Sequence, residues 1–209
     1  MPVYGDKLCF FHVQKTGGTW VRQAAKAAGI PLHPLGDDNE PVTHLPHAES
    51  KPEWYTDKLC FTFVRDPFTW LRSWFCSREK EQWTEMQGPS QKLHEIRADT
   101  FPAFIGNYLA KLPGEVGRIF SEYTDGCQYV GRTEDQPEPL IAVLRLAGYD
   151  FDPKLIRGMK KVNPAIPEIM AKAVCSPVLM HAVYAAEAEY CEKYEYPMAA
   201  PATGSGTAA

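Results

Sequence analysis

One short segment constrains the fold of this chain more than any other: an apolar run that ends in a turn rich in lysine and glycine. Residues 7–13 are apolar enough for a buried strand, and a helical pattern over residues 18–28 follows the turn Gln14-Lys15-Thr16-Gly17-Gly18-Thr19. This order brings backbone N–H groups, a lysine and threonine hydroxyls to one helix N-terminus, where an anionic group can bind. The sequence therefore predicts an α/β fold with an anion site at the end of its first strand.

The order of the lysine and the glycines excludes the common nucleotide-binding loop. In Gly-x-x-x-x-Gly-Lys-[Ser/Thr] the lysine follows the glycines, whereas Lys15 precedes Gly17 and Gly18. The simpler alternative is a strand–turn–helix connection whose glycines serve only the turn. Lysine, threonine and two glycines between a strong strand and a helix favour the anion site over that alternative.

A second motif follows the next apolar run, residues 59–64. Pro67 suits the first turn of a helix over residues 68–81, and Arg65 leaves the end of the strand, where open α/β sheets bind ligands. Ser73 lies about two helical turns further on and is expected to face the same side. An arginine fork with a hydroxyl predicts a second anion site beside the first. The alternative is a structural ion pair between Arg65 and Asp66 or another carboxylate.

The remaining segments complete a single domain over residues 1–197. We expect a third strand at residues 128–130, and helices over residues 137–147 and 165–194. Strands that alternate with helices predict a three-layer domain with a central parallel sheet flanked by helices. Residues 198–209, rich in Ala, Gly, Ser and Thr, are expected to form a disordered tail.

Composition narrows the classes of partner. The formal net charge of −4 argues against a nucleic-acid surface, and no apolar run is long enough to span a bilayer. The six cysteines lack Cys-x-x-Cys pairs, and the N-terminus lacks the pattern of a signal peptide. We therefore expect a cytoplasmic protein with reduced cysteines and neither a membrane nor a nucleic acid as its partner.

Two motifs of the chain resemble those of a known enzyme family. His12-Val13-Gln14-Lys15-Thr16-Gly17-Gly18-Thr19-Trp20 resembles the 5′-phosphosulfate loop of the PAPS-dependent sulfotransferases. Phe63-Val64-Arg65-Asp66-Pro67, with a serine eight residues after the arginine, resembles their 3′-phosphate motif. Residues 129–134, 160–163 and 189–194 are also similar to later segments of that family. The resemblance implies a P-loop NTPase-like fold that binds 3′-phosphoadenosine 5′-phosphosulfate (PAPS) and requires no metal.

The resemblance also implies roles for individual residues. The phosphosulfate would be held by Lys15, Thr16, Gly17, Gly18 and Thr19, with Lys15 also stabilising the departing phosphate oxygen. The 3′-phosphate would be held by Arg65 and Ser73, and the adenine would lie against Trp20. A later basic element of the family is not matched cleanly, and its candidates here are Arg157, Lys160 and Lys161.

The reaction also needs a base for the acceptor's proton. His44, in the loop before the second strand, is the first candidate because an imidazole titrates near neutral pH. His47, Glu49 and Glu40 remain open as alternatives. His12 is expected to be a packed residue, and most of the aromatic cluster around Trp70 and Trp74 is expected to be core.

The implied activity is transfer of a sulfuryl group from PAPS to a hydroxyl of a sugar or small-molecule acceptor, by in-line displacement. The products would be adenosine 3′,5′-bisphosphate (PAP) and a sulfate ester. Two alternatives stay open: a P-loop kinase acting on a small molecule with ATP and magnesium, and a nucleotide-binding protein without catalysis. The sequence predicts neither the acceptor nor the oligomeric state.

Overall fold

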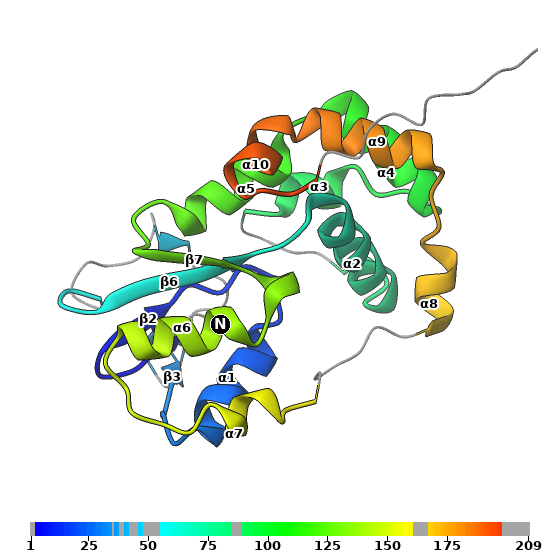
Figure 1. The fold of residues 1–209 in the computed structure, drawn as a ribbon. Coiled ribbons are helices and arrows are strands. Elements are labelled where there is room, and N and C mark those ends of the chain that lie inside the picture. Colours follow the sequence, from blue (N-terminus) through cyan, green and yellow to red (C-terminus); the bar gives the residue numbers. More distant parts are fainter. Residues whose placement is uncertain are drawn as a thin grey trace, which may run out of the picture.

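The main sheet of the protein has three parallel strands at its centre and edge. The computed structural model describes residues 3–34, 36–37, 40–41, 46–47, 55–84, 89–160 and 167–197. The strand order is β3-β1-β2-β6-β7, and β2, β6 and β7 run parallel (Figure 1). The strands of this sheet are β1 (Val3–Tyr4), β2 (Leu8–Phe10), β3 (His33–Pro34), β6 (Leu59–Val64) and β7 (Tyr129–Arg132).

The predicted parallel sheet is confirmed for β2, β6 and β7, but the sheet as a whole is mixed. β1 pairs antiparallel with both β2 and β3, so that two short strands extend the parallel core on one side. β1 reverses into β2 through a tight turn in which the Gly5 N–H donates to the Leu8 carbonyl at 2.8 Å. Two further short strands, β4 (Gly36–Asp37) and β5 (Glu40–Pro41), form a separate antiparallel pair.

Alternate residues of the parallel strands point to opposite faces of the sheet. Phe10 and Phe61 are paired in register and belong to one buried cluster, whereas Cys9 and Cys60 are paired in register and belong to another. Because both faces of these strands are buried, their sequences read as continuous apolar runs rather than as alternating patterns. The sheet is therefore the middle layer of an α/β fold.

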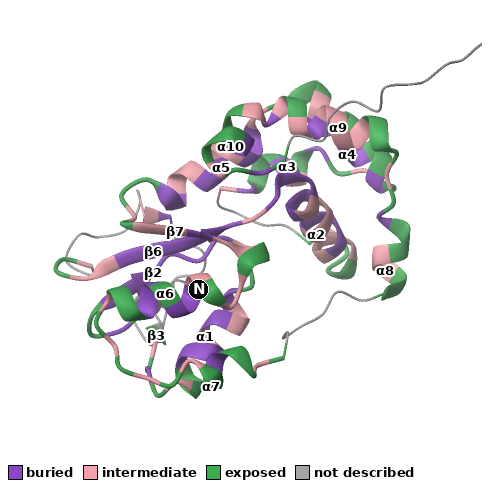
Figure 2. Ribbon diagram, in the orientation of Figure 1, coloured by how far each residue is buried: buried purple, intermediate pink, exposed green. Residues whose placement is uncertain are grey.

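Helices cover both faces of the sheet (Figures 1 and 2). One cluster of apolar side chains joins the sheet to α1 (Gly18–Ala27), α6 (Glu138–Leu146) and α7 (Lys154–Arg157). The other face carries the larger helical group: α2 (Pro67–Lys80), α3 (Gln91–Glu95), α4 (Phe101–Lys111), α5 (Glu115–Thr124), α8 (Pro167–Lys172), α9 (Pro177–Ala186) and α10 (Ala188–Lys193).

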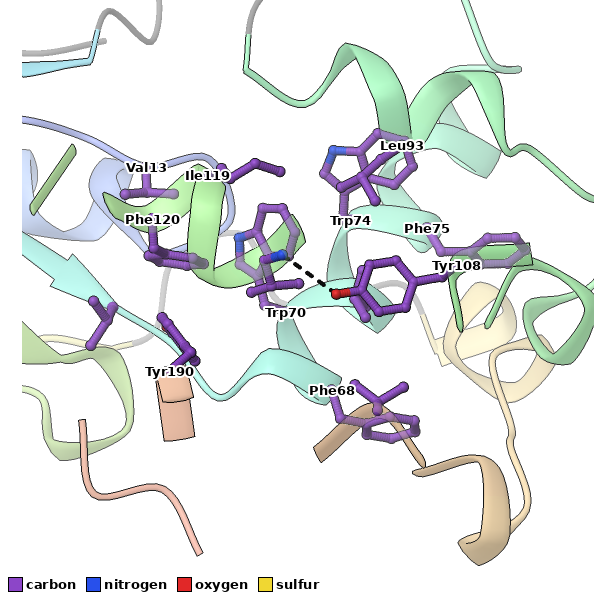
Figure 3. Close-up of a cluster of buried hydrophobic side chains, with 14 of the residues drawn as sticks. Val13, Phe68, Trp70, Trp74, Phe75, Leu93, Tyr108, Ile119, Phe120 and Tyr190 are labelled. Atoms are coloured by element: carbon purple, nitrogen blue, oxygen red, sulfur yellow. Dashed lines mark hydrogen bonds between the residues drawn. The ribbon is translucent and has the colours of Figure 1, made fainter. Parts of the chain in front are cut away.

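Tryptophan and phenylalanine side chains fill the larger cluster. Trp70 and Trp74 of α2 have no exposed surface, and Trp74 stacks on Phe104 with ring centroids 5.7 Å apart. Figure 3 shows Trp70 and Trp74 in this cluster, together with Tyr108 of α4 and Phe120 of α5. The prediction that the aromatic cluster is mostly core is confirmed for these residues. All six cysteines are free, and within the described residues no helix is both long and apolar enough to cross a bilayer.

Candidate functional site

The turn after β2 has a backbone that few residues adopt easily. Lys15 lies in the left-handed region with φ 65°, and Gly17, at the N-cap of α1, has φ 78°. A lysine in this region is uncommon, and such backbone strain is concentrated at functional sites. The Thr16 hydroxyl donates to the Val13 carbonyl at 2.8 Å and is buried. Thr16 therefore closes the turn with its side chain, and its hydroxyl proton is already used within the turn.

His12 contacts the loop at Gly18, the first residue of α1. Its Nε2 accepts a hydrogen bond from the Gly18 N–H at 3.2 Å, and its side chain is buried against Phe10. An imidazole nitrogen that accepts from an N–H group is unprotonated at that atom. His12 is thus a packed residue, as predicted, and it satisfies one of the free N–H groups at the start of α1.

Replacing Gly18 with alanine is expected to disrupt the loop. A Cβ at Gly18 would lie 2.3 Å from the His12 ring, so either the ring or the helix start must move. We expect a loss of about 1–3 kcal/mol in the free energy of unfolding, measured by urea denaturation. Gly106→Ala in α4 is the matched control, since nothing lies within 4 Å of its Cβ position. Equal stabilities of the two variants would contradict the proposed packing of His12 against Gly18.

Arg65 lies at the end of β6, beside the loop. Its Nη1 donates to the Lys15 carbonyl at 2.9 Å, and its Nε donates to the Thr69 hydroxyl at 3.3 Å. The guanidinium thus ties the end of the second parallel strand to the loop of the first. Thr133 lies directly after β7, and its hydroxyl donates to the Val64 carbonyl at 2.8 Å. This hydrogen bond links the end of the third parallel strand to the end of β6.

Asp66 does not pair with Arg65. Its Oδ1 accepts from the Thr69 N–H at 2.8 Å, and so caps α2, while its Oδ2 accepts from the Tyr184 hydroxyl at 2.9 Å. Within the described part of the chain, Arg65 forms no ion pair with any carboxylate. The alternative of a structural ion pair at Arg65 therefore has no support among these residues.

The described part of the chain contains no group of three or more His, Cys, Asp or Glu side chains suited to a metal ion.

The positively charged side chains of Lys15, Arg65 and Arg72 lie near one another after β2 and β6, and we call this group the corner. Burial, and then the charge of Arg65, lowers the pKa of Lys15 below its ordinary value. Burial also lowers the pKa of Arg65, opposed by Glu134 and Asp66 and reinforced by the positive charge of Arg72. No carboxylate among the described residues forms an ion pair with Lys15 or Arg72. Partly buried cations without paired carboxylates are suited to an anionic ligand.

The structure identifies residues of this corner that the sequence reasoning missed. Arg72 precedes Ser73 on α2, and its buried Nε has no hydrogen-bond partner among the residues described. Trp70 Nε1 donates to the Gln14 carbonyl at 2.8 Å and so anchors the loop to the core. Arg72 lies three residues after Thr69 on α2, and the Thr69 hydroxyl accepts a hydrogen bond from Arg65 Nε, so this helical spacing could have revealed the third cation.

The other described residues that were predicted to bind the donor are half-buried or exposed. Thr19 and Ser73 are half-buried, and Trp20 is half-buried against the cluster beneath α1 and α6. Lys160 follows α7 and is exposed, without a hydrogen bond or ion pair to another described residue. The neighbouring Arg157 is bound to Glu138 by two hydrogen bonds of 2.8 and 2.9 Å.

The candidates for the base lie mostly outside the described residues. That is so for His44 and Glu49, for the side chain of Glu40, and for the predicted donor ligand Lys161. His47 is described: it packs against the rings of Phe11 and Tyr55, and burial lowers its pKa. It also lies beside Gly126, in the turn before β7, at the far end of that strand from Thr133. These contacts do not bring His47 to residues 14–19, the lysine loop.

A groove of about 610 Å³ lies elsewhere, between α5 and the α9–α10 segment. Its lining includes Arg118 and Lys193, and contains none of the residues predicted to bind the donor. Arg118 is paired with Glu115 and Glu122. Since this guanidinium already has carboxylate partners, the groove is a weaker candidate for an anion than the corner at Lys15.

Comparisons with known proteins leave the chain without an assigned family. No protein-family model matches it, and neither the curated proteins nor the solved structures contain a match.

Proposed function

We propose that this protein is a sulfotransferase that moves a sulfuryl group from PAPS to a hydroxyl of a sugar or small-molecule acceptor. In this proposal the three-layer fold is P-loop NTPase-like, and the donor lies across the carboxyl ends of β2 and β6. The resemblance of the two motifs supplies the donor class. The observation that carries the proposal is the direct contact between the two motifs.

That contact joins two cationic residues from adjacent parallel strands. Arg65 Nη1 donates to the Lys15 carbonyl at 2.9 Å, and neither side chain has an ion-pair partner among the described residues. A ligand with two separated anionic groups would complement such a pair. PAPS carries both, with a phosphosulfate at one end and a 3′-phosphate at the other.

The proposed chemistry assigns a separate task to each group. The acceptor oxygen forms a bond to sulfur while the bond from sulfur to the 5′-phosphate oxygen breaks, and the hydroxyl proton passes to a base. Lys15 and the N–H groups at the start of α1 would stabilise the charge on the departing phosphate. Arg65 and Ser73 would hold the 3′-phosphate, with Lys160 and Lys161 as further ligands, and His44 is the proposed base.

Binding of PAP tests the donor class before any acceptor is known. Calorimetry with PAP, beside ATP with magnesium, is expected to show micromolar binding of PAP only. Arg65→Ala is expected to weaken this binding by about 10–100-fold, because it removes a charge-assisted contact of about 1.5–3 kcal/mol. Arg145→Ala is the matched control, since Arg145 is exposed on the last turn of α6 and is not a candidate ligand of the donor.

Each other outcome has a defined meaning. Binding of ATP with magnesium and not of PAP would contradict the sulfotransferase and favour the small-molecule kinase. Tight binding of PAP without turnover of PAPS, over a broad panel of sugars, alcohols and phenols, would favour a nucleotide-binding protein without catalysis. Equal losses from Arg65→Ala and Arg145→Ala would contradict the role given to Arg65.

A further inference from the structure

Tyrosines from the last described part of the chain hold the corner that carries Arg65. Tyr184 lies on α9, Tyr190 lies on α10, and Tyr196 follows α10. The hydroxyls of Tyr184 and Tyr190 donate to the segment after β6. The hydroxyl of Tyr196 donates to Glu134, whose carboxylate binds that segment. More than 100 residues of sequence separate these tyrosines from Arg65, so the contacts are tertiary.

Tyr190 makes the closest contact. Its hydroxyl donates to the Arg65 carbonyl at 2.7 Å. The Arg65 N–H in turn donates to the Tyr190 hydroxyl oxygen at 3.3 Å. The ring is 5% exposed and packs between Phe120, Tyr194 and Tyr196. Burial raises the pKa of Tyr190 well above its ordinary value, so the hydroxyl keeps its proton and remains a donor.

Tyr184 and Tyr196 hold the next residue. The Tyr184 hydroxyl donates to Asp66 Oδ2 at 2.9 Å. The Tyr196 hydroxyl donates to one carboxylate oxygen of Glu134 at 3.0 Å, and the other oxygen accepts from the Asp66 N–H at 2.9 Å. Both backbone polar groups of Arg65 and one of Asp66 are thereby fixed by side chains from outside the α2 segment.

We propose that Tyr190 is a positioning residue of the anion site, which fixes the Arg65 backbone so that the guanidinium reaches the loop. The inference rests on the proposed function for its ligand, because it assigns the C-terminal helices to the placement of a donor-binding arginine. Tyr184 and Tyr196 act on the same corner through Asp66 and Glu134. A ring that only filled the core would not need its hydroxyl at Arg65.

The experiment compares two hydroxyl deletions, one on α10 and one at the residue that follows its last turn. Tyr190→Phe removes the contact with Arg65, whereas Tyr194→Phe removes a hydrogen bond of 3.0 Å from the Tyr194 hydroxyl to Thr124, away from the loop. Two readouts are taken: hydrogen exchange of the Arg65 amide in the free protein, and calorimetric binding of PAP. Urea denaturation measures the stability of both variants.

We expect the two variants to be similarly stable and to differ in both readouts. In Tyr190→Phe the Arg65 amide should exchange about tenfold faster, because it loses a hydrogen bond, and PAP should bind about 5–10-fold more weakly. Tyr194→Phe should stay within about twofold of the wild type in both. Exchange and binding that are the same in the two variants would overturn the positioning role. If the wild type binds no PAP, the proposed function fails, and the exchange of the Arg65 amide alone decides for or against Tyr190.

Discussion

Replacing Lys15 with alanine is expected to lower the rate of the proposed sulfuryl transfer by about 10²–10³-fold, equivalent to about 2.7–4 kcal/mol in the transition state. The reason is the place of the ammonium group. Lys15 is half-buried beside the start of α1, and its pKa is lowered by burial and by the charge of Arg65. In the proposed reaction the departing 5′-phosphate becomes more negative in the transition state, so its attraction to a partly buried ammonium group becomes stronger. The release of PAP from PAPS, with an acceptor found by screening, measures the rate.

Lys26→Ala supplies the control for Lys15→Ala. Lys26 lies on the last turn of the same helix and is exposed, so its removal should leave the rate within about twofold of the wild type. A Lys15→Ala variant with wild-type turnover would remove Lys15 from the reaction. A pH series adds a second check: because the pKa of Lys15 lies below its ordinary value of 10.5, affinity for PAP should fall as the pH rises through that lowered pKa.

Several elements could be predicted from local sequence because local chemistry decides them. The strand over residues 59–64 is confirmed in full as β6, since a buried parallel strand must be apolar on both faces. The start of α2 is confirmed within one residue, because Asp66 caps the helix and Pro67 fits its first turn. The end of α1 is likewise fixed by Gly29, which has φ 77°.

Other features depend on contacts that local sequence does not reveal. α5 was not predicted, although one of its faces carries Val116, Ile119 and Phe120, because polar residues and a glycine interrupt the pattern. The antiparallel β1 is only two residues long, too short for a periodic signal. The lysine loop was predicted as an anion site. Trp70, which donates to the loop at Gln14, and Tyr190, which donates to the Arg65 carbonyl, come from distant segments, and no residue spacing in the sequence predicts these contacts.

Replacing Trp70 with alanine is expected to have the largest effect on stability, about 3–5 kcal/mol in the free energy of unfolding. The side chain has no exposed surface and lies edge-on to Phe120 with ring centroids 5.4 Å apart. Its Nε1 also donates to the Gln14 carbonyl at 2.8 Å, so the deletion leaves both a cavity and an unpaired carbonyl at the loop. Urea denaturation of the wild type and the variant measures the loss.

A pair of phenylalanine variants separates the effect on the loop from the effect on the core. Trp74 is as buried as Trp70, but its Nε1 has no hydrogen-bond partner among the described residues. Trp70→Phe therefore loses a contact to the loop that Trp74→Phe does not lose, although both remove similar volume. We expect Trp70→Phe to weaken binding of PAP about 3–10-fold, and Trp74→Phe to leave it within about twofold. If both variants bind PAP equally well, the core does not position the loop through Gln14, and the loop keeps its shape through His12 and Arg65 alone.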